Sequence, residues 1–291
     1  PLMMVEKILK ISLSSLMILL LSSCSIAGSW VYERLDSYLA DYFKEFADFS
    51  KEQNQEIELI SEEFLNWFSE NELLKIKLLI EDLKKIDLKN PEERVASAYR
   101  QGEEIFRKVN NFFERPIINF SKGLNEDQIN QIDNHFKELR KEREEERKNE
   151  KKEYKDRLLE NYISGFDRIG IDLTDDQVEA IKLKLENHIE VRKEWSELQQ
   201  NWINEFVQLL KRNNSYGYES RMSAYLDSLE ELGNEEFRDK IEKNEMLSME
   251  IISFVFLTSN ERQIKGFNRS LDIYLKSINR ILLKRKVNNS A

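Results

Sequence analysis

Apolar residues recur at steps of three and four along almost the whole chain beyond residue 34, and this spacing constrains the fold more than any other feature. Such a spacing places side chains on one face of an α-helix, which has 3.6 residues per turn. Only eight glycines and three prolines interrupt the 291 residues, and these are the two strongest helix breakers. The sequence therefore predicts an all-α fold, an elongated bundle of about eight antiparallel helices.

Four segments share a helix-opening pattern in which an apolar residue precedes a Ser, Thr or Asn cap, and Gln or Glu follows three residues after the cap. This is a capping box: the cap side chain accepts from the backbone amide at the third helical position, whose own side chain reaches back. The unequal intervals between the four segments exclude a solenoid. We expect these helix-cap residues to be structural: Ser50 and Gln53; Leu124, Asn125 and Gln128; Leu173, Thr174 and Gln177; Leu257, Thr258 and Glu261.

The N-terminal segment has the order of a bacterial lipoprotein signal peptide. Lys7 and Lys10 precede an uncharged apolar run over residues 11–21, and Ser22-Ser23-Cys24-Ser25 follows as a lipobox-like site. We expect residues 1–23 to be removed by cleavage between Ser23 and Cys24, and Cys24 to carry S-diacylglycerol and an N-acyl chain. The alternatives are an ordinary secretory signal and a single membrane helix, for which the apolar run is short.

These features predict the organisation of the mature chain. A short tether over residues 24–34 leads into a single all-helical periplasmic domain within 24–291. Ser25, where an Asp would favour the inner membrane, predicts that the lipid anchor holds the protein at the periplasmic face of the outer membrane. Trp30 is expected in the core or, since it lies near the anchor, at the membrane interface.

Charge and breaker patterns give three further expectations. The net charge of −10, without an evident basic tract, argues against nucleic-acid partners and against electrostatic binding to a membrane. Residues 137–157 are almost all charged with both signs mixed, which predicts an exposed charged helix, or alternatively a charged contact arm. One helix is expected to close before Pro116.

The residues that usually carry chemistry are sparse. Cys24 is the only cysteine, and His135 and His188 are the only histidines, neither of them in an HExxH or Glu-x-x-His pattern. The sequence also lacks G-x-S-x-G, P-loop and G-x-G-x-x-G motifs. We therefore expect no metal, no cofactor and no catalytic residue, although an acidic pair of a hydrolase stays open as an alternative.

Trp195 and Trp202 are seven residues apart and so share one helical face. Their simplest interpretation is as core residues. The alternative is that they line a surface that receives apolar segments of another protein.

The helix start Leu173-Thr174-Asp175-Asp176-Gln177 resembles the LTxxQ motif of periplasmic proteins such as the chaperone Spy and the stress protein CpxP. Most of the chain resembles a family of uncharacterised bacterial lipoproteins of unknown function. This resemblance rests on the lipobox and on segments at Leu35 to Leu39, Ser50 to Gln53, Trp67 with Glu72-Leu73, Arg192 to Trp195 and Leu271 to Tyr274. It implies the envelope location and the helical fold.

Together these observations predict a non-catalytic, lipid-anchored helical module that binds other envelope proteins or unfolded clients. A structural scaffold or spacer of the cell envelope is the main alternative, and an unrecognised hydrolase is the remaining one.

Overall fold

The computed structural model describes residues 34–150, 152–228 and 232–288. In these ranges the protein has eleven α-helices and no strand, so the predicted all-α fold with antiparallel packing is confirmed. The helices are α4 (Leu35–Lys44), α5 (Lys51–Asn71), α6 (Leu73–Leu83), α7 (Glu92–Lys122), α8 (Glu126–Lys148), α9 (Tyr154–Arg168), α10 (Asp175–Leu185), α11 (Arg192–Leu210), α12 (Tyr218–Asp227), α13 (Glu235–Leu257) and α14 (Glu261–Asn288).

The predicted signal peptide, Ser23, Cys24, Trp30 and all of the predicted tether except residue 34 lie outside the described residues. Among the helices that are described, none combines the length and apolar character needed to cross a bilayer.

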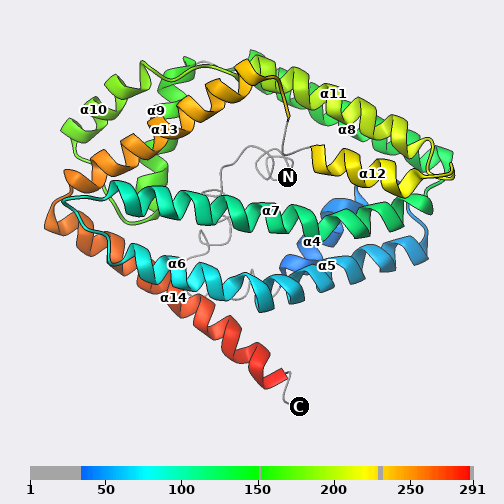
Figure 1. Cartoon of the computed structure of the whole chain (residues 1–291), viewed down its shortest axis with the longest axis horizontal. Helices are drawn as coiled ribbons and strands as arrows, with labels where there is room; N and C mark the ends of the chain where they lie inside the picture. The colour runs from blue at the N-terminus through cyan, green and yellow to red at the C-terminus, as the bar shows by residue number, and fades with distance from the viewer. Residues whose placement is uncertain (1–33, 151, 229–231, 289–291) are drawn as a thin grey trace.

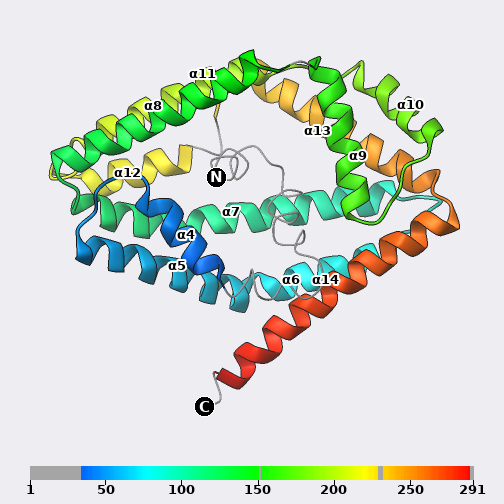
Figure 2. The ribbon, with the colours of Figure 1, turned by 180° about the vertical axis from the view of Figure 1, so that it is seen from behind.

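The helices form an open frame around the long helix α7, which crosses the middle of the molecule (Figure 1). Helices α5 and α6 run along one side of α7. On its other side lie two groups, α8 with α11 and α12 towards one end and α9 with α10 and α13 towards the other. The rear view shows α4 folded back on α5 and the C-terminal part of α14 projecting beyond the frame (Figure 2).

Two apolar clusters hold this arrangement together. The larger one joins α5, α6, α7, α9, α10, α13 and α14 around residues such as Phe68, Ile181 and Ile251, all almost completely buried. The smaller one joins the end of α7 to α8, α11 and α12 around Ile118 and Met222. Helix α7 therefore contributes to both cores.

This double role explains why the prediction of a helix end before Pro116 is wrong. Pro116 lies inside α7, where it lacks the N–H that would bond to the preceding turn. The helix continues because Val109 is buried in the larger cluster and Ile118, two residues past the proline, is buried in the smaller one. Burial on both sides outweighs the missing hydrogen bond.

The predicted charged helix over 137–157 is wrong in its bounds. Helix α8 ends at Lys148 and α9 begins at Tyr154. The charged part of α8 also packs along α11, since Leu139 is buried and Arg143 Nη1 donates to Gln199 Oε1 at 3.2 Å. Interruptions of this kind, without glycine or proline, also explain why the described residues form eleven helices where about eight were expected.

Candidate functional site

The predicted helix starts meet in two pairs. Three of them form as expected, with Ser50, Asn125 and Thr174 each accepting from the backbone amide three residues later. The fourth differs in register: Asn260 is the cap and Gln263 supplies the returning side chain. The assignment of Thr258 and Glu261 to these roles is therefore wrong. Thr258 instead ends α13 as its C-cap, and its Oγ1 donates to the last-turn carbonyl of Phe254 (2.9 Å).

The first pair joins the α4–α5 and α7–α8 turns through Gln53 and Gln128. Gln53 Nε2 donates to Gln128 Oε1 at 3.2 Å, and Gln128 Nε2 donates to Gln53 Oε1 at 2.7 Å. Gln53 also donates to the carbonyl of Gly123 (3.1 Å), and Gln128 to the carbonyl of Asp48 (3.2 Å). We call this arrangement of Gln53 and Gln128 the first clasp.

The second pair joins the α9–α10 and α13–α14 turns through Gln177 and Gln263, here called the second clasp. Gln263 Nε2 donates to Gln177 Oε1 at 2.7 Å and to the carbonyl of Asp172 at 2.8 Å. Gln177 Nε2 donates to Thr258 Oγ1 at 3.0 Å. Thr258, wrongly predicted as a cap, is thus a partner in the clasp.

Both clasps follow one rule. Each glutamine bonds to the residue two positions before the cap of the partner helix: Gly123, Asp48, Asp172 or Thr258. Three of the glutamines are buried, and their amides are engaged by these bonds and by the capping boxes. Since buried amides satisfied in this way have no capacity left for a ligand, the clasps are structural joints between helix turns.

A glycine pair adds to the second clasp. Gly170, with a φ of +80°, lies against Gly266 of α14 so closely that a Cβ on Gly170 would meet the Gly266 carbonyl at 2.5 Å. Neither position accommodates a side chain. The turn before α10 and the first turns of α14 therefore touch through their backbones.

The two tryptophans of the predicted partner surface are half-buried, and each lies against other aromatic rings. Trp195 stacks on Phe237 of α13 at a centroid distance of 6.1 Å. Trp202 stacks on Phe206 of its own helix at 5.5 Å and on Tyr225 of α12 at 5.0 Å. The partner surface stays a prediction.

Three of the residues that carried the family resemblance lie at contacts between helices. Trp67 packs on Phe112 with ring centroids 5.0 Å apart. Glu72 is buried at the junction of α5 and α6 and accepts from Lys75 Nζ at 2.7 Å. Tyr274 donates from its hydroxyl to the carbonyl of Arg168 at 2.9 Å. These three contacts join helices.

The histidines lie in different surroundings. The ring of His135 contacts Phe46 at a centroid distance of 4.4 Å. His188 Nδ1 lies 3.1 Å from the hydroxyl of Tyr154, and burial together with the charge of Lys155 lowers the pKa of His188. Over the described ranges, no three His, Cys, Asp or Glu side chains come together as a metal site would require.

One acidic pair has perturbed titration. Burial, followed by the charge of Glu245, raises the pKa of Glu103 on α7. Burial also raises the pKa of Glu245 on α13, an effect that the hydrogen bond from Tyr99 opposes. Sequence patterns did not single out these residues, since they come together only through the packing of α7 on α13.

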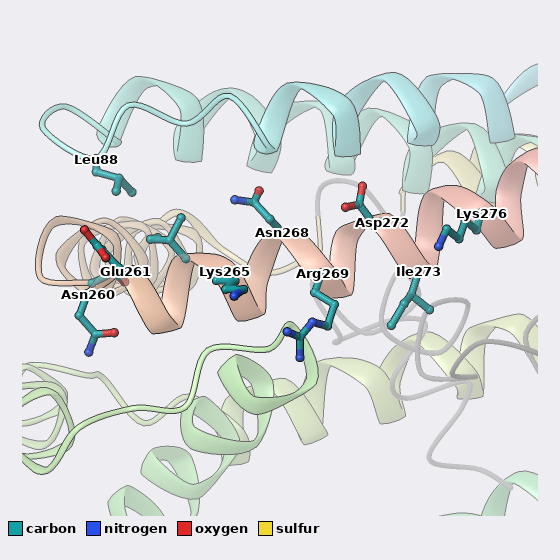
Figure 3. A pocket seen from close by; sticks show the side chains of 11 residues that line it. Leu88, Asn260, Glu261, Lys265, Asn268, Arg269, Asp272, Ile273 and Lys276 are labelled. Carbon is teal, nitrogen blue, oxygen red and sulfur yellow. The ribbon is translucent and has the colours of Figure 1, made fainter.

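A groove of about 730 Å³ follows the outer face of α14 and is bordered by Leu88 before α7. In the close view, Lys265, Arg269 and Lys276 line it together with Ile273, while Asn268 and Asp272 turn towards α6 (Figure 3). This cationic face was missed from the sequence. The signal that marks it is the recurrence of Lys and Arg at helical spacing along residues 262–284.

Comparison with known protein families places the chain. Residues 45–238, about two thirds of the sequence, match the family described as "Family of unknown function (DUF6279)". The chain belongs to the DUF6279 family. The predicted membership of a family of unknown function is thereby confirmed, while the lipid anchor and the relation to LTxxQ proteins stay predictions.

The DUF6279 match includes three of the four capping boxes and the whole first clasp, and it ends before the box at Asn260. Neither the curated proteins nor the solved structures gave a match to the chain.

Proposed function

We propose that this DUF6279 protein is a non-catalytic helical module that binds apolar segments of other envelope proteins or of unfolded clients. In this proposal, Cys24 is acylated and holds the module at the periplasmic face of the outer membrane. The lipobox-like segment supports the anchor, and the capping boxes of LTxxQ type support the comparison with periplasmic chaperones.

The observation that carries the binding role is a pair of exposed leucines on α6. Leu74 and Leu78 are 50% and 55% exposed and lie one turn apart on the same helix face. The opposite face of α6 buries Leu73, Ile76 and Ile80 in the larger core. Since α6 already has a complete buried face, a second apolar surface is not needed for folding and is suited to contact with a partner.

The test is suppression of aggregation. The full chain at micromolar concentration is mixed with a heat-unfolding model client, and light scattering is followed. We expect the scattering to fall, and the Leu74→Gln/Leu78→Gln double variant to lose most of this effect. The matched control is Leu183→Gln/Leu283→Gln, which removes two exposed leucines that lie on separate helices, α10 and α14.

Three results would contradict the proposal. The first is that the chain fails to suppress aggregation. The second is that the control variant loses as much suppression as the α6 variant. The third is that the chain hydrolyses model esters or glycosides with an activity that Glu245→Gln abolishes. The anchor is tested separately by mass spectrometry of the mature N-terminus, where Cys24→Ala must prevent acylation.

A structural scaffold is the second candidate, and the two clasps favour it because they tie turns far apart in sequence into fixed joints. A scaffold is expected to form a defined oligomer without affecting client aggregation. Analytical ultracentrifugation of the full chain distinguishes the two candidates.

A further inference from the structure

Helix α14 carries a row of cations along its outer face. Arg262, Lys265, Arg269, Lys276, Arg280 and Lys284 follow one another at steps of three, four or seven residues, and all six side chains are exposed. Steps of this kind keep side chains on one face of a helix. We call these six residues the basic stripe. Its length is about 33 Å, from the rise of 1.5 Å per residue.

The face of α14 opposite the stripe is apolar and buried. Phe267, Leu271, Tyr274, Ile278 and Ile281 lie in the larger core. The core thus fixes the rotation of α14 about its axis and turns the basic stripe outwards. The stripe is therefore a consequence of how the helix packs.

The basic stripe also contrasts with the rest of the chain. Helix α14 contains eight basic and two acidic residues, a net charge of +6, whereas the whole chain has −10. Both acids of α14 lie before residue 273. Asp272 turns towards α6 and pairs with Lys84 at 2.5 Å, and the Arg262–Asp172 pair is loose at 3.8 Å between two highly exposed side chains. The expectation that the chain lacks a basic tract is therefore wrong for α14.

We propose that the basic stripe binds the anionic phospholipid headgroups of a membrane surface, with α14 lying along that surface. A row of exposed cations can face a plane of phosphate groups and attract them. Because the apolar side of α14 is buried in the protein core, the helix does not have to insert into the bilayer. Each Lys or Arg near such a surface contributes about fivefold in affinity. A lipid anchor supplies a second attachment to the membrane and so strengthens a contact that is weak by itself. The role of the basic stripe in the cell therefore rests on the proposed anchor.

Nucleic acid fits the same face less well. Single-stranded nucleic acid is bound by cations together with exposed aromatic rings on which bases stack. The aromatic residues of α14 are Phe267 and Tyr274, and both are buried.

The experiment measures co-sedimentation of the unacylated full chain with vesicles of phosphatidylcholine alone or with about one third phosphatidylglycerol. The test variant is Lys265→Gln/Arg269→Gln/Lys276→Gln. The control variant, Lys51→Gln/Lys182→Gln/Lys211→Gln, removes the same charge from exposed positions outside α14. Residues 1–23 are present in all proteins, so differences between variants report on the stripe. The thermal midpoint of each variant confirms folding.

We expect the wild type to prefer the anionic vesicles, the preference to fall at high salt, and the stripe variant to bind them more than tenfold less tightly than the control variant. The proposal is overturned when binding is equal for both vesicle types, when the two variants lose the same affinity, or when a DNA or RNA duplex at the same salt binds more tightly than the vesicles. The aggregation test of client binding contains no vesicles. A failure of client binding therefore leaves the vesicle-binding result unaffected.

Discussion

The side-chain amides of Gln53 and Gln128 bond to each other in both directions across 75 residues of sequence, at 3.2 and 2.7 Å. Each glutamine also completes the capping box of its own helix. One side chain thus caps a helix and joins it to another. The second clasp repeats the arrangement with Gln177 and Gln263, so helix ends distant in sequence are fastened by a common device.

Removing Gln128 should therefore destabilise the protein by more than the loss of a cap. Gln128→Ala removes its bonds to Gln53 and Asp48 and leaves the amide oxygen of the half-buried Gln53 without this donor, for an expected loss of about 2 kcal/mol in the free energy of unfolding. Urea denaturation measures it, with the exposed Gln55→Ala as control. A double-mutant cycle with Gln53→Ala should give a coupling of about 1 kcal/mol, and additive effects would contradict the clasp.

The register of the fourth helix start gives a second prediction. Asn260→Ala should cost about 1 kcal/mol because it removes the side chain that accepts from the Gln263 amide. Gln263→Ala should cost more, since Gln263 is buried and also bonds to Gln177 and Asp172. The control is Glu261→Ala at an exposed position, expected within about 0.5 kcal/mol of wild type. If thermal denaturation shows Glu261→Ala to be the most destabilising of the three changes, the register predicted from the sequence, with Thr258 as the cap, is correct.

The fold class and the first three helix starts followed from the sequence because both rest on local physics. Helical periodicity and capping boxes involve residues within one or two turns of each other. The fourth start was misplaced because Thr258 and Asn260 both have capping side chains, and only the position of the second clasp selects Asn260. Pairing of the boxes depends on packing between distant helices, which no local pattern contains.

The same distinction applies to the surface. The basic stripe was overlooked because only the net charge of the whole chain, −10, was considered, although α14 alone carries +6. The helical spacing of the Lys and Arg residues is evident once the bounds of α14 are known. The pair of Glu103 and Glu245 had no sequence signal at all. Their proximity arises from α7 packing on α13.

The contact between Gly170 and Gly266 gives a third prediction. Gly266→Ala would push a Cβ into the backbone of Gly170 and force α14 away from the second clasp, for a loss of about 1–3 kcal/mol in the free energy of unfolding. Gly165→Ala in α9 is the matched control, because its Cβ would have no neighbour within 4 Å. There, higher helix propensity should stabilise the protein by about 0.5–1 kcal/mol. Equal effects of the two changes in urea denaturation would refute the close approach.

The fourth prediction concerns pH. Burial raises the pKa of Glu245 above its ordinary value of 4.5. At pH values between the unfolded and the folded pKa, the folded state therefore holds a proton that the unfolded state has released. Stability therefore falls as the pH rises from the unfolded pKa through the raised folded pKa, and the deficit remains at neutral pH. Glu103 acts in the same direction, since burial and the charge of Glu245 raise its pKa too.

Glu245→Gln removes the half-buried charge and so removes its effect on the pKa of Glu103. Near pH 4.5 the free energy of unfolding of the variant should not exceed that of the wild type. Towards pH 7 the variant should gain stability relative to the wild type, by less than about 1 kcal/mol because the carboxyl group is partly solvated. Urea midpoints at pH 4.5, 5.5 and 7 measure the difference. Glu179→Gln on the exposed face of α10 is the control, and its difference from wild type should stay flat. If the difference for Glu245→Gln instead shrinks as the pH rises, the carboxylate is stabilised by its surroundings and the acidic pair between α7 and α13 does not exist as described.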